Sequence, residues 1–218
     1  MTYPFDGLSN LQMSKLYDLL EVHVYNFKKN EQILSTINNT NIIGIVLEGC
    51  LQIINIEYNG DTVVLETLDK YGVFGTNISA IYIGNCEIIS KQDSQILVFN
   101  YNELIKPDNV KYPYFNVFLQ NLFNIVNIKY KKTNERIKVL EEKQIRNKLL
   151  RYFELEYKKS NLKYIYLPFS LKDLADYISV NRSAMFRELK HLREERFIEI
   201  KNRKITLLYK NNNINLDF

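Results

Sequence analysis

The sequence predicts an α+β protein in which an N-terminal antiparallel β-roll, a long central helix and a C-terminal winged helix-turn-helix follow one another. Short runs rich in Ile, Val, Leu and Tyr, separated by turn residues, extend from Val22 to about Tyr101, as in all-β rolls and barrels. A helical pattern without turn signals follows Pro107, and two capped helices and a basic hairpin come after it. We therefore divide the chain into residues 1–106, 107–140 and 141–218.

The length and charge of the chain favour two modest domains, of which only the second is basic. The chain has 218 residues, 46% of them hydrophobic, so it can bury a core in each domain. Residues 1–140 carry 12 Lys and Arg against 14 Asp and Glu, whereas residues 141–218 carry 17 against 11. A basic surface attracts phosphates and releases condensed counterions on binding, which favours a polyanionic partner for the second half. A basic surface that meets only solvent is the alternative.

The two cysteines do not have the spacing of a metal or disulfide motif. Cys50 and Cys86 each lie in an apolar run without a CxxC pair, so we expect buried free thiols, and a redox pair only if they are adjacent across strands. No apolar run reaches the roughly 18 to 20 residues that span a bilayer, and the N-terminus lacks the basic-then-apolar order of a signal peptide. We therefore expect a cytoplasmic protein without a membrane partner.

The clearest elements within the first 106 residues are a capped helix and a hairpin. Leucines near helical spacing after Ser9 predict a helix over residues 8–21. Two strand-like runs between residues 53 and 68 flank Asn59-Gly60, the two-residue signal of a type I′ turn. A hairpin is therefore expected there.

The residues between Phe115 and Leu140 form one long helix in our interpretation, because about 26 residues, equivalent to about 39 Å, pass without a turn signal. Apolar residues cover more than one stripe of this helix, as expected where a helix packs on its own domain and on a second chain. We therefore expect a homodimer. A helix fully buried in a monomer is the alternative. The residues assigned to the dimer contact are Phe118, Leu122 and Ile125.

The pattern beyond residue 140 predicts a helix-turn-helix. An amphipathic helix over residues 143–157 comes first. Ser170 and Asp173 then have the spacing of a capping box at the start of a second helix. After a short link, Asn181 is a good N-cap for a third helix. The apolar face of that helix consists of Met185, Leu189 and Leu192.

The opposite face of the third helix is polar and basic, and the hairpin that follows has a basic tip at residues 201–204. Such a helix can enter the major groove of double-stranded DNA while a basic wing lies beside the phosphate backbone. A generic helical hairpin with a solvated charged face is the alternative, but it does not predict the caps, the basic face and the wing together. We assign DNA contacts to Ser170, Asn181, Arg182, Ser183, Phe186, Arg187, Lys190, Lys201, Arg203 and Lys204.

The chain resembles the Crp/Fnr family of bacterial regulators over nearly its full length. The most specific stretch is residues 170–208, SLKDLADYISVNRSAMFRELKHLREERFIEIKNRKITLL, which resembles the helix-turn-helix and wing of that family. Upstream, IVLEGCLQII and NGDTVVLETLDKYGVFG are similar to its β-roll, which is built like a cyclic-nucleotide-binding domain. The resemblance implies a homodimeric, DNA-binding transcription regulator that contacts RNA polymerase.

Departures from the family pattern bear on the effector. In members that bind cyclic AMP, Phe-Gly is followed by a Glu that holds the ribose, and an Arg farther along binds the cyclic phosphate. Here Thr76-Asn77 follow Phe74-Gly75, and Glu87 lies in the strand that matches the Arg, where a carboxylate would repel a phosphate. By resemblance, the effector pocket would include Gly75, Thr76, Asn77 and Glu87. We expect no control by cyclic AMP and no cofactor, and the small-molecule effector stays unidentified.

The third helix also departs from the family pattern. Family members often present Arg-Glu-x-x-x-Arg, whereas here Ser183 replaces the Glu and Arg187 keeps the second Arg. A guanidinium suits guanine O6 and N7, but a serine cannot replace the preference of a carboxylate for cytosine. Phe186 either contacts a thymine methyl or packs on a neighbouring residue. We expect a palindromic, A·T-rich site with one guanine per half-site.

An enzyme is the main alternative class, because rolls of the cupin-like kind also hold catalytic metals. Such sites need several His and a carboxylate, whereas His23 and His191 are the two histidines of the chain. The cysteines of iron–sulfur family members are absent from residues 1–49, and His23 in an alternating segment is better explained as a solvated histidine than as a haem ligand. We therefore expect no metal and no catalysis. A second alternative is that the roll is a ligand-independent scaffold or a protein-interaction module.

Overall fold

The computed structural model describes residues 3–37, 41–58, 62–75, 78, 86–160, 162–167 and 170–211. The chain folds as two compact units, Met1–Lys129 and Tyr130–Phe218. The Asn59-Gly60 turn predicted from the sequence lies outside the described residues, as do Thr76 and Asn77.

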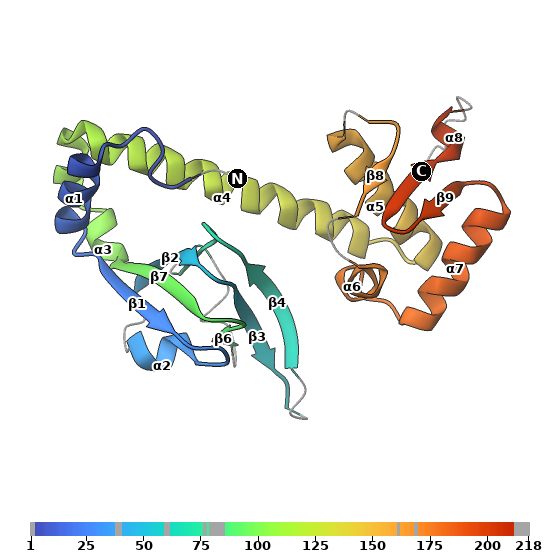
Figure 1. Cartoon of the computed structure of the whole chain (residues 1–218), viewed down its shortest axis with the longest axis horizontal. Coiled ribbons are helices and arrows are strands. Elements are labelled where there is room, and N and C mark those ends of the chain that lie inside the picture. The colour runs from blue at the N-terminus through green and yellow to red at the C-terminus, as the bar shows by residue number, and fades with distance from the viewer. Residues whose placement is uncertain are drawn as a thin grey trace. The chain divides into compact units, whose positions relative to one another are not determined.

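The first unit contains two antiparallel sheets and several short helices (Figure 1). One sheet has the strand order β1-β7-β2-β5 and the other has the order β4-β3-β6. Strands β3 and β4 pair as the predicted hairpin requires. The elements are α1 (Asn10–Leu19), β1 (His23–Phe27), α2 (Ile33–Ile37), β2 (Ile42–Glu48), β3 (Leu51–Ile56), β4 (Thr62–Leu68), β5 (Val73–Gly75), β6 (Cys86–Ser90), β7 (Ser94–Asn100), α3 (Tyr101–Leu104) and η1 (Pro107–Lys111), followed by the start of α4 (Pro113–Leu140).

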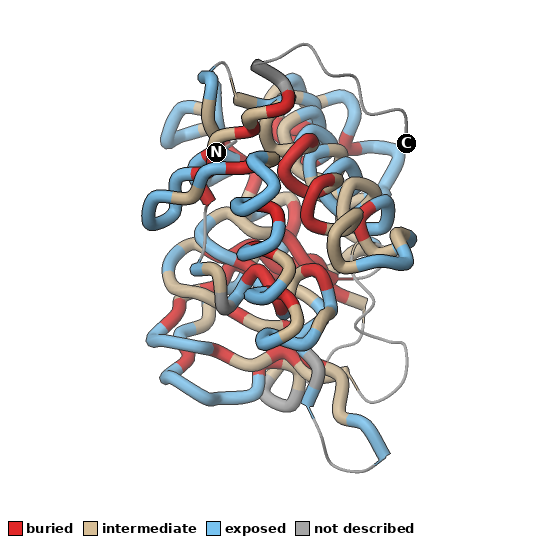
Figure 2. Tube along the Cα trace, turned by 90° about the vertical axis from the view of Figure 1, so that its right-hand side faces the viewer, coloured by how far each residue is buried: buried red, intermediate tan, exposed pale blue. Residues whose placement is uncertain are grey.

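Strands β2, β5 and β7 are buried along most of their length, so both of their faces are covered, whereas the edge strand β1 is largely exposed. Figure 2 colours the buried residues red. In β7, Ile96 and Val98 pack into the core that both sheets share, whereas Leu97 and Phe99 pack under α1 and α4. This two-sided burial explains why β2 reads as a continuous apolar run instead of an alternating one. The expected N-terminal helix is confirmed, and Ser9 closes a capping box with Gln12.

Glycines allow the backbone to approach neighbours closely inside this unit. A Cβ atom built on Gly44 would lie 2.2 Å from Cζ of Phe74, so the phenyl ring packs directly on the β2 backbone. Gly75, which we placed in an effector pocket, has a φ of +128°, and a Cβ there would lie 2.0 Å from the carbonyl oxygen of Ile42. The conformation and packing of the strand pair therefore require glycine at both positions.

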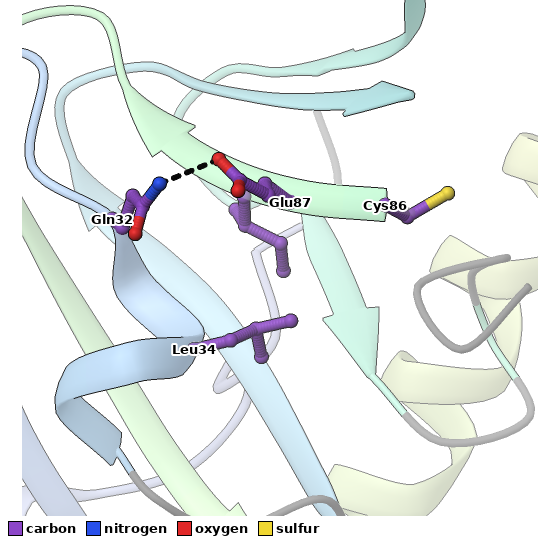
Figure 3. Close-up of a pocket in the computed structure, with 5 residues that line it drawn as sticks. Gln32, Leu34, Cys86 and Glu87 are labelled. Atoms are coloured by element: carbon purple, nitrogen blue, oxygen red, sulfur yellow. Dashed lines mark hydrogen bonds between the residues drawn. The ribbon is translucent and has the colours of Figure 1, made fainter. Parts of the chain in front are cut away.

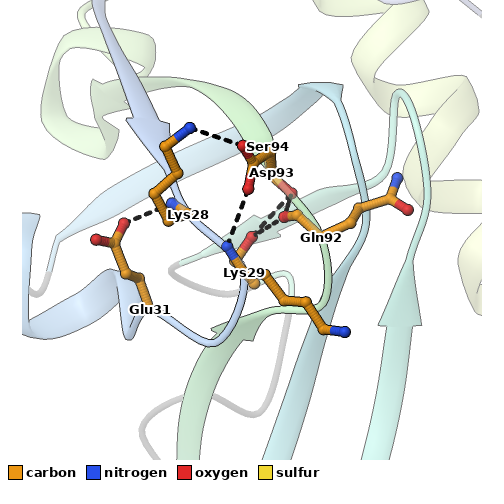
Figure 4. Close-up of polar contacts among 7 residues, drawn as sticks. Lys28, Lys29, Glu31, Gln92, Asp93 and Ser94 are labelled. Atoms are coloured by element: carbon orange, nitrogen blue, oxygen red, sulfur yellow. Dashed lines mark hydrogen bonds and ion pairs between the residues drawn. The ribbon is translucent and has the colours of Figure 1, made fainter.

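A network of polar contacts joins the β1–α2 turn to the β6–β7 turn (Figure 4). The Nζ atom of Lys28 lies 2.7 Å from Oδ2 of Asp93, and the backbone N–H of Lys29 donates to Oδ1 of the same residue at 3.2 Å. The ammonium of Lys28 lowers the pKa of Asp93 by donating this hydrogen bond. Ser90 and Ser94 are buried next to this network and share a hydrogen bond of 2.9 Å. The network fixes two turns and exposes its charges to solvent.

The strand register separates the two cysteines. Cys86 pairs with Asn55 in the β3–β6 ladder, whereas Cys50 immediately precedes the first residue of β3. Five residues of extended chain span about 17 Å, and a disulfide requires Cα atoms about 4 to 7 Å apart. The hypothesis of an intramolecular redox pair is therefore wrong for this fold, and neither cysteine is part of a disulfide.

Helix α4 buries two of the residues that we assigned to the dimer contact in the core of their own unit. Phe118 and Leu122 are only 1% and 3% exposed, because they pack into the core of their own unit together with Phe99. Ile125 is partly buried against the same cluster. Other apolar side chains of α4 are exposed. They are Leu119, Phe123, Ile128, Tyr130 and Ile137.

The second unit has the expected winged helix-turn-helix architecture, built around one apolar core. Its three-stranded antiparallel sheet has the order β8-β10-β9, in which β8 is a two-residue strand that the sequence analysis did not predict. After the end of α4, its elements are α5 (Ile145–Lys159), β8 (Ile165–Tyr166), α6 (Leu171–Tyr177), α7 (Arg182–Glu194), β9 (Ile198–Lys201), β10 (Lys204–Leu207) and α8 (Leu208–Asn211).

Among the described residues, we find no helix that combines the length and the apolar character needed to cross a membrane.

Substitution of Gly75 by Ala tests the structural role of that glycine. Because a Cβ would overlap the Ile42 carbonyl, we expect a loss of about 3 kcal/mol or more in the free energy of unfolding. Gly7→Ala is the matched control, since Gly7 also has a positive φ but has no atom closer than 3.7 Å to the built Cβ. It should lose about 1 to 2 kcal/mol. Urea denaturation followed by tyrosine fluorescence measures both; equal losses would refute the steric argument.

Candidate nucleic-acid interface

Helix α7 presents one polar face to solvent. Asn181 caps its start, where the side-chain oxygen accepts a hydrogen bond of 3.2 Å from the N–H of Ala184. At 100° per residue, the outward positions span an arc of about 140°. The exposed side chains on this arc are Arg182, Ser183, Phe186, Arg187 and Lys190. Every residue that we assigned to the face of this helix is therefore exposed, and Phe186 is 47% exposed.

Helix α6 and the turn after it set the position of α7. The predicted capping box is present, with the N–H of Asp173 donating to Oγ of Ser170 at 3.2 Å and the N–H of Ser170 donating to Oδ2 of Asp173 at 3.3 Å. The Ser170 hydroxyl also donates to Oδ2 of Asp173 at 2.7 Å. Ser170, which we assigned to the DNA contacts, is exposed and also caps α6. Ala175 is completely buried, as expected where helices cross closely.

Two cations hold the C-terminal end of α6. Arg136 Nε donates to the carbonyl oxygen of Tyr177 at 3.1 Å, and its guanidinium lies 5.3 Å from the centre of the Tyr177 ring. Lys148 Nζ donates to the carbonyl oxygen of Ile178 at 3.3 Å. Positive charges are favourable at a helix C-terminus, where carbonyl groups lack intrahelical partners. The final turns of α4 and the start of α5 thus fix the end of the first helix of the helix-turn-helix.

Arg146 anchors the other end of α7. Its guanidinium donates to both carboxylate oxygens of Glu195 at 3.1 and 2.5 Å and lies 3.4 Å from Glu188. It also stacks 4.7 Å from the centre of the Phe197 ring. Hydrogen bonds from Arg146 lower the pKa of Glu195. A two-point contact of this kind fixes orientation as well as distance. Sequence reasoning missed this anchor because its members are about 50 residues apart.

Some of the cations that face solvent are paired with carboxylates of the same unit. Arg182 Nη2 lies 2.7 Å from Asp176. Lys190 lies 3.7 Å from Glu194, one helical turn away. Arg187, by contrast, has no ion-pair partner among the residues that the structure describes. Its guanidinium therefore keeps its donors available for a ligand.

The wing is an amphipathic sheet with one basic face. Its inner rows include Ile165, Ile200 and Ile205, which pack on the core. On the outer face Lys204 pairs with Tyr166 on one side and with Lys201 on the other. The exposed cations of the wing are Lys201, Arg203 and Lys204.

Two tyrosines lie beneath the wing cations. Lys204 Nζ is 3.8 Å from the centre of the Tyr164 ring, and the Arg203 guanidinium is 5.5 Å from the centre of the Tyr166 ring. Sequence reasoning missed both tyrosines. The alternation of residues 164–167, Tyr-Ile-Tyr-Leu, is the signal that could have indicated a strand with these two rings on one face.

The structure describes only part of the expected effector site. Gly75 is buried within a strand, and Glu87 lines a shallow hollow of about 190 Å³ together with Leu34, Cys86 and Ile88 (Figure 3). Gln32 completes the hollow, and its Nε2 donates to Glu87 at 2.6 Å. Gly75 is not among the residues that line this hollow, so the described part does not bring Gly75 and Glu87 into one pocket.

Metal chemistry finds no support in the described part of the chain. It contains no group of three or more His, Cys, Asp and Glu side chains that could hold an ion. His23 lies exposed on β1.

Solved structures with low sequence identity share this fold. CprK complexed with OCPA is 15% identical, with a TM-score of 0.66 over 91% of this chain and 92% of that chain. A protein from Listeria monocytogenes EGD-e that contains a cyclic nucleotide-binding domain is 16% identical, with a TM-score of 0.60 over 91% of this chain and 99% of that chain. A CooA mutant from Carboxydothermus hydrogenoformans is 16% identical, with a TM-score of 0.58 over 94% and 96%. No curated protein matches the chain.

The capped helix-turn-helix, its polar face and the basic wing are the features of a DNA-binding winged helix-turn-helix domain. Residues 134–211 match the Crp-like helix-turn-helix domain, which confirms the resemblance seen in the sequence. The C-terminal part of the chain therefore contains a Crp-like helix-turn-helix domain, and the chain as a whole shares the fold of these solved structures.

The pair formed by Arg146 and Glu195 predicts an acid-sensitive stability difference. Because the folded-state pKa of Glu195 is lowered, its contribution is present above the ordinary Glu pKa of about 4.3 and is lost as the pH falls through the folded-state value. Glu195→Gln should therefore lower Tm at pH 7, and this deficit should shrink as the pH falls below the ordinary Glu pKa.

The neighbouring change Glu194→Gln serves as control, since Glu194 contacts Lys190 only at 3.7 Å on the surface. It should leave Tm nearly unchanged at both pH 7 and pH 3. Calorimetry of the full chain measures these differences. A Glu195→Gln deficit that stayed constant from pH 7 to pH 3 would contradict the role of the charge.

Proposed function

We propose that the protein binds a palindromic, A·T-rich DNA site as a homodimer and reads one guanine in each half-site with Arg187. The main support for this proposal is the guanidinium of Arg187. It is exposed on the polar arc of α7 and has no ion-pair partner among the described residues. A guanidinium donates to O6 and N7 of guanine in the major groove. Ser183 and Phe186 lie on the same arc and suit less selective contacts with A·T pairs.

Phosphate contacts in this proposal come from the helix ends and the wing. The wing follows α7 in the sequence and belongs to the same unit. Its exposed cations are Lys201, Arg203 and Lys204. Cations placed this way fix the register of the protein on the duplex without reading bases. Two such domains in a dimer would contact half-sites about 34 Å apart, which is one turn of DNA.

The homodimer proposal rests on the exposed stripe of α4. Its members follow spacings of four, three, four and seven residues, which is the pattern of a coiled-coil seam. The seam residues are Leu119, Phe123, Tyr130 and Ile137, which are exposed, and Val126, which is half-buried; the exposed Ile128 lies off this stripe. Phe123 and Tyr130 are 64% and 65% exposed in the single chain, so a second copy of α4 would remove a large apolar area from water. This seam replaces the Phe118, Leu122 and Ile125 face expected from the sequence.

We infer that cyclic AMP does not control this protein. A carboxylate at Glu87, held at 2.6 Å by Gln32, would repel a cyclic phosphate. The space between the two sheets is filled by apolar side chains, including Phe74 and Ile88, in the part of the roll that the structure describes. This filling favours a second candidate, in which the roll is a ligand-independent scaffold that contacts a protein such as RNA polymerase. A DNA-binding regulator of this kind would act in the cytoplasm.

Arg187 and Lys204 should have different effects on DNA binding. Arg187→Ala should weaken binding to a selected site by about 1 to 3 kcal/mol and relax the preference for guanine, whereas Lys204→Ala should weaken all duplexes alike and reduce the salt slope by about 1. Selection from a randomised duplex pool, followed by anisotropy titrations at several KCl concentrations, measures both effects. Wild-type affinity and selectivity in Arg187→Ala would refute the assignment.

Charge placed on the α4 seam should dissociate the dimer. Phe123→Glu should sediment near the chain mass of 25.9 kDa, whereas the wild type should sediment at about twice that mass. Asn124→Glu, an exposed neighbour on a different side of the helix, is the matched control and should stay dimeric. Analytical ultracentrifugation at micromolar concentration distinguishes the two states, and a dimeric Phe123→Glu would show that the seam lies elsewhere.

Cyclic nucleotides should leave the stability of the protein unchanged. A ligand that binds the folded state at one hundred times its Kd stabilises it by about 2.7 kcal/mol, which raises Tm measurably. We therefore expect no change in Tm with millimolar cyclic AMP. A concentration-dependent rise in Tm would overturn the inference from Glu87.

A further inference from the structure

We propose that Tyr164 and Tyr166 are positioning residues that hold the wing cations for contact with DNA phosphates. This inference rests on the proposed function, and it deepens the role of the wing. Neither tyrosine was among the residues that the sequence indicated as DNA contacts. The structure places their rings under Lys204 and Arg203, at 3.8 and 5.5 Å from the ring centres.

The tyrosines are held in place by the strand that carries them. Ile165, between them, is 2% exposed and pairs with Ile205 of β10. Leu167 is fully buried, and its N–H donates to the carbonyl oxygen of Arg203 at 2.9 Å. The backbone beneath the rings is thus fixed to both the core and the tip of the wing. A ring on such a strand has little freedom to move away from its cation.

The ring faces support the cations without neutralising them. Lys201, on the same sheet face, lies 2.9 Å from the Glu199 carboxylate, which compensates part of its charge and would repel an approaching phosphate. Lys204 and Arg203 instead lie over neutral aromatic faces, where the ring quadrupole attracts a cation without adding a compensating charge. Glu199 also attracts Lys204, but more weakly than it attracts Lys201, with which it forms an ion pair. A long side chain also loses less conformational freedom on binding when it is already ordered. The two tyrosine-supported cations are therefore the better phosphate ligands of the wing.

Tyr166 is 61% exposed, so most of its ring surface does not serve the domain core. This exposed aromatic ring lies next to two cations, Lys204 on the neighbouring strand and Arg203 in the turn before that strand, and the support of those cations explains its exposure. Because the ring contributes little to the core, a variant with an aliphatic side chain at this position should fold normally.

The test uses the full-length protein and a fluorescein-labelled duplex of 30 base pairs and arbitrary sequence, because phosphate contacts do not depend on the operator. Tyr164→Leu and Tyr166→Leu remove the ring faces, whereas Tyr164→Phe and Tyr166→Phe keep them. We expect each Leu variant to raise Kd about two- to fivefold, and each Phe variant to bind like the wild type. Tm measurements confirm that each variant is folded.

A double-mutant cycle separates positioning from a general structural effect. In a Lys204→Met background, Tyr164→Leu should cause no further loss, because the ring has no cation left to hold. An equal loss in both backgrounds would overturn the proposal. If Lys204→Met weakens binding and Tyr164→Leu does not, the positioning role fails and the proposed function stands. If the wild type does not bind the duplex, the proposed function itself fails.

Discussion

Helix α7 carries a single apolar stripe, and the burial of that stripe determines which of its side chains can meet DNA. Met185, Leu189 and Leu192 are 0%, 3% and 0% exposed in the core of the winged domain. Burying each of them contributes about 2 kcal/mol, so a rotation of the helix would expose apolar surface and drive charged groups into the core. The polar arc is thus fixed by packing on the far side of the helix. Arg146, through Glu195, then fixes the end of the same helix.

Much of the positive charge of the winged domain serves its own structure. Arg136 and Lys148 are directed to carbonyl groups at the end of α6, and Arg146 is engaged by two carboxylates. Arg182 contacts Asp176. A net positive charge therefore overstates the number of cations available to a phosphate backbone. The distinction between internal and outward cations requires coordinates, because all of them look alike in a sequence.

The sequence patterns predicted the elements whose periodicity is long or whose caps are specific, such as α4 and the Ser170 and Asn181 caps. They did not predict β8, since two residues are too few to display a period. They also did not show that Phe118 and Leu122 are buried in their own unit, because two apolar stripes on one helix are equivalent until the sheet beneath them is known. The separation of Cys50 from Cys86 followed only from the strand register.

Phe74 packs directly on Gly44, so it connects the two apolar layers of the β-roll unit, one between the two sheets and one beneath α1 and α4. The ring lies in the layer between the sheets, and Ile43 and Ile45, on either side of Gly44, lie in the layer beneath α4 with Phe118. One thickness of backbone separates the layers, and a protein interior packed like an organic crystal has little free volume to absorb a displacement. A displacement of the Phe74 ring toward Gly44 would therefore displace the β2 backbone and the residues on which α4 packs. The sheet is thus a rigid layer that couples the interior of the roll to α4.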